Sequence, residues 1–139
     1  MARKSARAAA MQMVFEHMLG GDGGEETLGE LIEFTPEGDD AAYMDDVLAG
    51  VLAHQSEIDA EIGKSSRGWS VERLSRVDLA IMRLSVYEMF YREDVPASVA
   101  INEAVALAGR YSLPTSGKFV NGVLGDIWRR KEAQADQQQ

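Results

Sequence analysis

Apolar residues recur at three- and four-residue steps over most of the chain, which is the spacing of one face of an α-helix. The predicted helices cover residues 5–19, 27–34, 40–62, 70–74, 75–91, 97–110 and 116–130. No segment alternates with the period of two that is typical of a strand for long enough to propose a sheet. The pattern therefore predicts an all-α fold, a single domain of about seven helices in one bundle.

Two of the helix starts carry capping signals. Ser75 and Asp78 have the spacing of a capping box, as do Thr27 and Glu30. The end of the chain is different, because residues 132–139 are polar and rich in glutamine. We therefore expect a helical domain over residues 1–131 and a polar, disordered tail after it.

Composition narrows the possible chemistry. The chain has 139 residues, enough for one domain with its own core, and it has no cysteine, which excludes disulfides, thiolate metal sites and cysteine catalysis. The histidines, His17 and His54, lack metal-ligand spacing and have no paired nucleophile. No apolar run approaches the roughly 20 residues of a membrane span. We predict no catalytic residue, metal or cofactor, and the composition is compatible with a cytoplasmic protein.

Charge is distributed unevenly along the chain. The net charge is −9, and 14 acidic residues but no Lys or Arg fall between Glu16 and Glu61. An acidic protein repels phosphates, so broad nucleic-acid binding is disfavoured. The acidic half can equally be a solvated surface that aids solubility, and a local basic patch on the rest of the chain stays possible.

Cations gather at the beginning of the chain. Arg3 and Arg7 are four residues apart and share a helix face, and Lys4 lies between them. One interpretation is a basic tail without a partner, and the other is a short clamp for phosphates. Three cations would give modest affinity by themselves, because counterion release grows with the number of phosphates neutralised.

A second candidate opens the last predicted helix. Lys118, Phe119 and Asn121 lie where unpaired backbone N–H groups already favour a phosphate. A cation, an aromatic ring and an amide are also a suitable set for single-stranded RNA. The alternative for Phe119 is a place in the core beside Val120 and its neighbours.

Two further positions have structural interpretations. Glu88 falls on an apolar stripe, so its carboxylate needs a partner, for which Arg83 or Arg110 is a candidate. Gly122 lies inside a predicted helix, where glycine costs up to about 1 kcal/mol relative to alanine. Its missing side chain suggests a close contact between helices.

The segment from Asp94 to Leu124 resembles the C-terminal signature of the NusB family of bacterial transcription antitermination factors. The matching runs are Asp94-Val95-Pro96, Val99-Ala100-Ile101-Asn102-Glu103-Ala104 and Lys118-Phe119-Val120-Asn121-Gly122-Val123-Leu124. The run RVDLAIMRLSVYEMFY, residues 76–91, also has the form found in this family. The resemblance implies an all-helical fold of two packed subdomains.

The resemblance also implies a function. Members of this family are non-enzymatic adaptors that bind the boxA element of nascent ribosomal RNA and help to keep RNA polymerase processive. An arginine-rich N-terminus contributes to RNA binding in the family, and this chain has Arg3, Lys4 and Arg7 there. Together with Lys118, Phe119 and Asn121, these are the predicted RNA-binding residues.

The partner implied by the resemblance is NusE, a small ribosomal-subunit protein. An aromatic residue at the position of Phe15 and an acid at that of Asp78 lie in the NusE-binding surface of the family. We place Met18, Leu19 and Met82 in the same predicted surface. A homodimer is also possible, since the family includes both monomers and dimers.

Two other interpretations belong to different classes of protein. NusB-like domains also precede RNA cytosine methyltransferases, but this sequence has no βαβ cofactor pattern and no cysteine. The other is a helical protein-interaction module with weak or lost RNA binding, which the few N-terminal cations favour.

Overall fold

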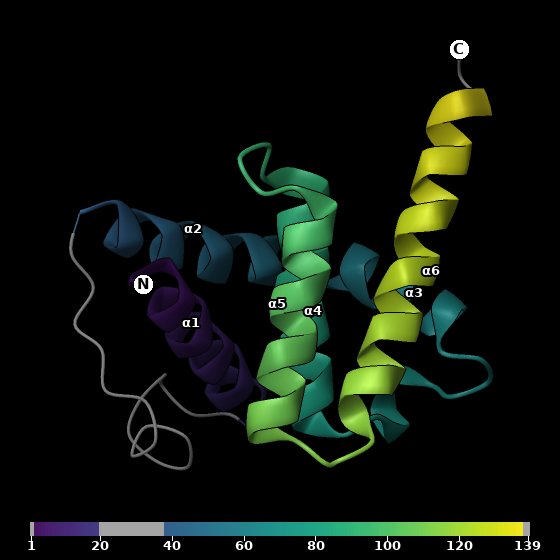
Figure 1. Cartoon of the computed structure of the whole chain (residues 1–139), viewed down its shortest axis with the longest axis horizontal. Coiled ribbons are helices and arrows are strands. Elements are labelled where there is room, and N and C mark those ends of the chain that lie inside the picture. The colour runs from purple at the N-terminus through teal and green to yellow at the C-terminus, as the bar shows by residue number, and fades with distance from the viewer. Residues whose placement is uncertain (1, 20–37, 138–139) are drawn as a thin grey trace.

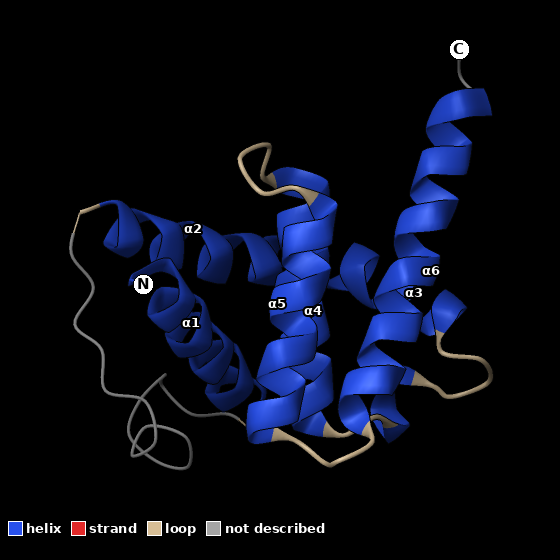
Figure 2. Cartoon of the chain, viewed as in Figure 1, coloured by secondary structure: helices blue, strands red, loops and turns tan. Residues whose placement is uncertain are grey.

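The structure is a computed structural model that describes residues 2–19 and 38–137. The described elements are α1 (Ala2–Met18), α2 (Asp39–Ala53), α3 (Gln55–Ser65), the short 3-10 helix η2 (Val71–Arg73), α4 (Arg76–Tyr91), α5 (Ala97–Tyr111) and α6 (Ser116–Gln137). All described elements are helices (Figure 2), which confirms the predicted all-α class. The predicted helix over residues 27–34 lies outside the described part.

Helix α4 is the centre of the molecule. It packs against α1, α2, α3, α5 and α6, and every residue from Asp78 to Met89 is buried. Helices α1 and α2 lie on one side of it, and α6 lies on the other side with α3 (Figure 1). Helix α5 packs on both α4 and α6. A helix surrounded in this way is apolar around most of its circumference, as the RVDLAIMRLSVYEMFY sequence is.

The beginning of α4 is capped as the sequence predicts. The Asp78 backbone N–H donates to the Ser75 Oγ at 3.1 Å. The Asp78 carboxylate does not complete the capping box with Ser75. It accepts hydrogen bonds from the hydroxyls of Ser112 at 2.6 Å and Ser116 at 3.0 Å, which flank the turn between α5 and α6. One acid therefore joins three helix ends.

The predicted continuous helix over residues 40–62 is wrong, because the chain turns at His54 between α2 and α3. The His54 ring stacks on Tyr91 of α4, with 4.1 Å between the ring centroids. Neither proline nor glycine marks the corner, and the apolar spacing continues across it. A tertiary contact holds the turn, so the local pattern carries no sign of it.

The predicted end of the last helix near Arg130 is also wrong, because α6 continues to Gln137. Residues 132–136 are exposed, so the helix here is not held by core packing. Lys131, Glu132, two alanines and two glutamines in this segment are good helix formers, and no proline or glycine follows Gly125. The expected disordered tail is helical as far as it is described.

No described helix has both the length and the apolar character needed to cross a membrane.

Candidate nucleic-acid and partner interface

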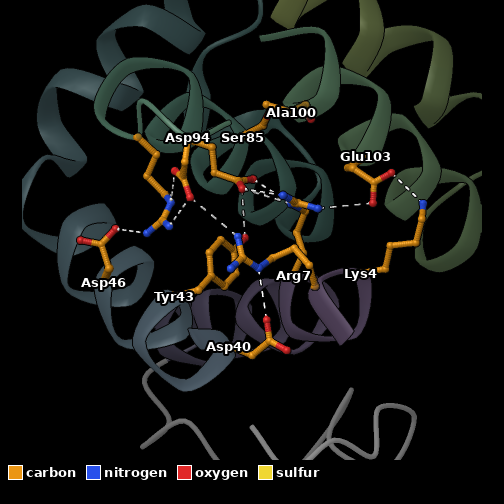
Figure 3. Close-up of polar contacts among 12 residues, drawn as sticks. Lys4, Arg7, Asp40, Tyr43, Asp46, Ser85, Asp94, Ala100 and Glu103 are labelled. Atoms are coloured by element: carbon orange, nitrogen blue, oxygen red, sulfur yellow. Dashed lines mark hydrogen bonds and ion pairs between the residues drawn. The ribbon is translucent and has the colours of Figure 1, made fainter. Parts of the chain in front are cut away.

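The N-terminal cations are paired with acids from other helices. The Arg3 Nε lies 3.2 Å from the Asp40 Oδ1, and the Lys4 Nζ lies 2.8 Å from a Glu103 carboxylate oxygen. The Lys4 ammonium is exposed, so its pair is open to water and to competing ions. Figure 3 shows Lys4 and Arg7 both reaching Glu103, from α1 to α5.

Arg7 has a different environment from its neighbours. Its side chain is only 6% exposed and that of Glu88 only 1%, and the guanidinium makes three hydrogen bonds of 2.9–3.1 Å to the Glu88 carboxylate. The Tyr43 hydroxyl donates to the same carboxylate at 3.1 Å. Burial alone would lower the pKa of Arg7, but its hydrogen bonds and attraction to Glu88 raise that pKa overall.

Arg7 is an interior residue that neutralises Glu88, so its guanidinium is not accessible in this structure and its predicted contact with RNA stays a prediction. The predicted partners of Glu88 are wrong. Arg83 is hydrogen-bonded to Asp59 at 2.7–2.8 Å, and the Arg110 guanidinium lies 5.5 Å from the ring centroid of Tyr111.

Because Tyr43 is buried in this cluster, we expect the folded chain to lose stability at alkaline pH. Burial and the adjacent Glu88 carboxylate raise the pKa of Tyr43 far above its ordinary value near 10. The folded chain therefore keeps a proton that the unfolded chain releases above pH 10, so stability falls as pH rises through that value. We expect the urea midpoint to fall between pH 9 and 11, with a smaller pH dependence in Tyr43→Phe. An unchanged dependence in that variant would contradict the assignment.

Helix α6 begins at a corner where the described cations are not paired. Lys118 and Asn121 are exposed on its first turns, and Arg110 is exposed at the end of α5. Neither Lys118 nor Arg110 makes an ion pair with any residue in the described ranges. Glu103 is the only acid between Ala97 and Gly125. We call Arg110, Lys118 and Asn121 the α5–α6 corner.

The interior fixes the position of this corner. Ser112 and Ser116 are tied to Asp78, which holds the turn between α5 and α6 against the start of α4. Phe119 is half-buried and packs against the core, so its ring is only partly available. Ser112 and Ser116 lie on either side of Pro114, and the sequence alone gives no sign that Asp78 is their acidic partner.

The structure does not bring the two groups of predicted RNA-binding residues onto one face. Lys4 contacts α5 through Glu103, whereas Gly117 at the start of α6 approaches Val105. Two residues along a helix correspond to a rotation of about 200°, so these contacts use opposite sides of α5.

The residues of the predicted partner surface differ in how exposed they are. Phe15 and Met82 are buried in the core, and the Asp78 carboxylate is occupied by two hydroxyls. Phe15, Asp78 and Met82 are therefore interior residues in this structure, and their predicted part in partner binding stays a prediction. Met18 is half-buried, and Leu19 is 49% exposed.

A cavity of about 470 Å³ lies beside the end of α1. Its walls come from α1, α3, η2 and α4, and are formed by His17, Met18, Gln55, Asp59, Val71, Glu72, Leu74, Arg76, Leu79 and Arg83. The sequence pattern did not reveal this cavity, because its walls come from four separate segments.

Gly122 does not have the close helix contact that we predicted. A Cβ placed there would have no neighbouring atom within 4 Å, apart from the local helix backbone. The close approach occurs instead at Gly50 of α2, where a Cβ would overlap the ring of Tyr87.

The fold and the site together define a class: a small all-α protein with a basic α5–α6 corner that has no ion pair within the described residues, and a cavity between the end of α1 and the start of α4. The NusB family model matches residues 4–129. The transcription antitermination protein NusB of Acetivibrio thermocellus is 44% identical over 137 residues, which cover 98% of this chain and 94% of that relative. The chain belongs to the NusB family.

Solved structures agree with this assignment. T. maritima NusB matches with a TM-score of 0.79 and 34% identity, over 91% of this chain and 90% of that one. A crystal structure of the antitermination factors NusB and NusE in complex with double-stranded RNA contains a chain that matches with a TM-score of 0.77. That match has 28% identity and covers 93% of this chain and 97% of the other.

Proposed function

We propose that this protein is a cytoplasmic transcription antitermination factor, a non-enzymatic adaptor that binds boxA RNA together with a NusE protein and acts in the RNA polymerase complex. The observation that carries the RNA part is the α5–α6 corner. It presents Lys118 and Arg110 without an ion pair in the described structure, on a stretch of chain that has a single acid, Glu103. That acid is already paired with Lys4 and Arg7.

The chemistry of the corner suits RNA. The Lys118 ammonium can neutralise a phosphate beside the first turn of α6, where backbone N–H groups also attract anions. The exposed Asn121 lies one turn further along the helix and can reach a base edge. Two cations on a protein of net charge −9 give weak binding, so joint binding with a second protein supplies the remaining affinity.

The protein-partner part of the proposal rests on the end of α1. Met18 borders the cavity beside α1, and the apolar Leu19 is exposed next to it. Aliphatic and thioether side chains at the edge of a cavity provide an apolar rim that a partner can contact, and a partner side chain can fill the cavity itself. This supports NusE docking through Met18 and Leu19, without direct contact to the buried Phe15 and Met82.

A second candidate function is a helical protein-interaction module with lost RNA binding. The specific observation in its favour is that Arg3, Lys4 and Arg7 are all paired with acids of the same chain. The two functions are distinguished by titrating boxA RNA and a scrambled RNA, with and without NusE. Equal affinity for both RNAs in the presence of NusE would rule out the antitermination proposal.

Replacing Lys118 with alanine tests the α5–α6 corner directly. We expect boxA affinity to fall about fivefold, equivalent to about 1 kcal/mol. We also expect the slope of log affinity against log salt to decrease by about 0.7, the value for one phosphate on a single strand. Fluorescence anisotropy at several salt concentrations measures both quantities.

Lys131→Ala is the matched control, because Lys131 lies on the same helix with its ammonium 4.3 Å from the ring centroid of Phe90. It should leave the salt slope unchanged. Equal losses in both variants would show that net charge, and not the corner, sets the affinity. A large fall in the melting temperature of Lys118→Ala would show a structural role instead.

A further inference from the structure

A second group of cations lies in the connection between α3 and α4. Residues 64–76 contain four basic residues and one acid, Glu72. Lys64 lies 3.7 Å from Glu61 in an exposed pair. Arg67 and Arg73 are exposed and make no ion pair with the described residues. The unpaired charge of this connection contrasts with the N-terminal cations, which other helices neutralise.

The centre of the connection is a tight turn over residues 66–69, which we call the Trp69 turn. The Trp69 backbone N–H donates to the Ser66 carbonyl at 3.2 Å. Both central residues have positive φ, 51° at Arg67 and 91° at Gly68, as in a type I′ turn. Arg67 is the only residue other than glycine with positive φ in the described ranges. Such a conformation persists only where the surroundings hold it.

The Trp69 turn is held by buried contacts on the α6 side. Ser66 is fully buried, and its hydroxyl donates to the Ile62 carbonyl. The adjacent Ser65 hydroxyl donates to Asp126 of α6 at 2.7 Å and accepts from Arg130 of α6 at 2.6 Å. The turn is therefore a rigid projection from α3 and α6. Figure 1 shows this connection beside α6, leading to the end of the bundle where α6 begins.

The turn presents an aromatic ring to solvent. Trp69 is 55% exposed, the largest exposure among the exposed aromatic side chains of the described residues. Folding does not require an indole at such a position, since most of its surface stays in water. An exposed indole between unpaired arginines is a combination by which proteins bind single-stranded nucleic acids. The ring stacks on a base, and the cations contact the phosphates. A protein partner of the same site would need acids to match the arginines.

We propose that the Trp69 turn is a second RNA contact, in which an unpaired base stacks on the Trp69 indole and Arg67 and Arg73 contact the flanking phosphates. This inference rests on the proposed RNA-binding function and adds a site to it. The α5–α6 corner and the Trp69 turn are both attached to α6. A strand of RNA that follows this helix surface contacts both sites, which makes up for the few cations at either one.

The experiment uses single-stranded boxA RNA with unpaired nucleotides on both sides. The chain has two tryptophans, so Trp128→Phe leaves Trp69 as the only one. Stacking should quench the emission of this variant in a saturable and salt-sensitive manner. In the otherwise unchanged chain, Trp69→Ala should weaken RNA binding about tenfold, as expected for one stacked base. Arg67→Asn removes the charge but keeps a residue that tolerates positive φ, and should weaken binding about threefold.

Leu52→Ala is the matched control, because Leu52 is 47% exposed on the acidic α2 and is not expected to contact RNA. Unchanged affinity in Trp69→Ala, alongside weaker binding in Lys118→Ala, would overturn the second site and leave the proposed function intact. Absence of boxA-specific binding in the unmodified chain, with NusE present, would overturn both. Loss of NusE binding in Trp69→Ala without loss of RNA affinity would assign the turn to the protein partner and overturn the RNA contact.

Discussion

Replacing Arg7 with alanine is expected to lower the free energy of unfolding by about 3–5 kcal/mol, the range observed when one member of a buried ion pair is removed. The Glu88 carboxylate, 1% exposed, would lose three hydrogen bonds and the one cation that pairs with it among the described residues, and would keep the Tyr43 hydroxyl. Chemical denaturation followed by circular dichroism measures the loss. The residue looks like a surface cation in the sequence, so this result would show whether Arg7 is a buried partner of Glu88 or an exposed cation.

Lys4→Ala is the matched control on the same helix. Its ion pair with Glu103 is exposed, so its removal should cost no more than about 1 kcal/mol. The double variant Arg7→Met with Glu88→Leu removes both buried charges and should recover most of the stability lost in Arg7→Ala. A small effect of Arg7→Ala, similar to that of Lys4→Ala, would contradict the buried pair.

Replacing Gly50 with alanine is expected to destabilise the fold by about 1–3 kcal/mol, the usual cost of overpacking. The new Cβ would overlap the Tyr87 ring, which is buried and whose hydroxyl donates to Asp46 at 3.0 Å. A rigid ring held at both ends cannot move aside without losing these contacts. The change in the denaturation midpoint measures the effect.

Gly122→Ala also replaces a glycine inside a helix, but the expected effect on stability is the opposite. Gly122 lies in α6 with open space around it, so alanine should stabilise the helix by up to about 1 kcal/mol. Destabilisation by Gly122→Ala, or stabilisation by Gly50→Ala, would show that the packing around these helices differs from the one described.

Features that depend on nearby residues were predictable from the sequence. The helical class follows from the apolar spacing, and the start of α4 follows from Ser75 and Asp78, three residues apart. Lys118 and Asn121 at the start of α6 are both exposed, and their contact with RNA stays a prediction. In each case the residues that decide the outcome lie within one or two helical turns of each other.

Features that depend on distant residues were not predictable in the same way. Arg7 and Glu88 are 81 positions apart, and the hydroxyls that occupy Asp78 come from residues 34 and 38 positions later. The corner at His54 depends on Tyr91 of another helix. A pattern of apolar spacing contains no information about which side chain of one helix faces which side chain of another.

The sequence by itself determined the all-α class, the order of the main helices and the resemblance to the NusB family, because helical periodicity, caps and motifs are local properties of the chain. Only the tertiary structure decided which cations are accessible. It paired Arg3, Lys4 and Arg7 with acids and left Lys118, Arg67 and Arg73 without ion pairs in the described residues. The physical reason is that the availability of a charge depends on its neighbours in space, and folding brings those neighbours from distant parts of the chain.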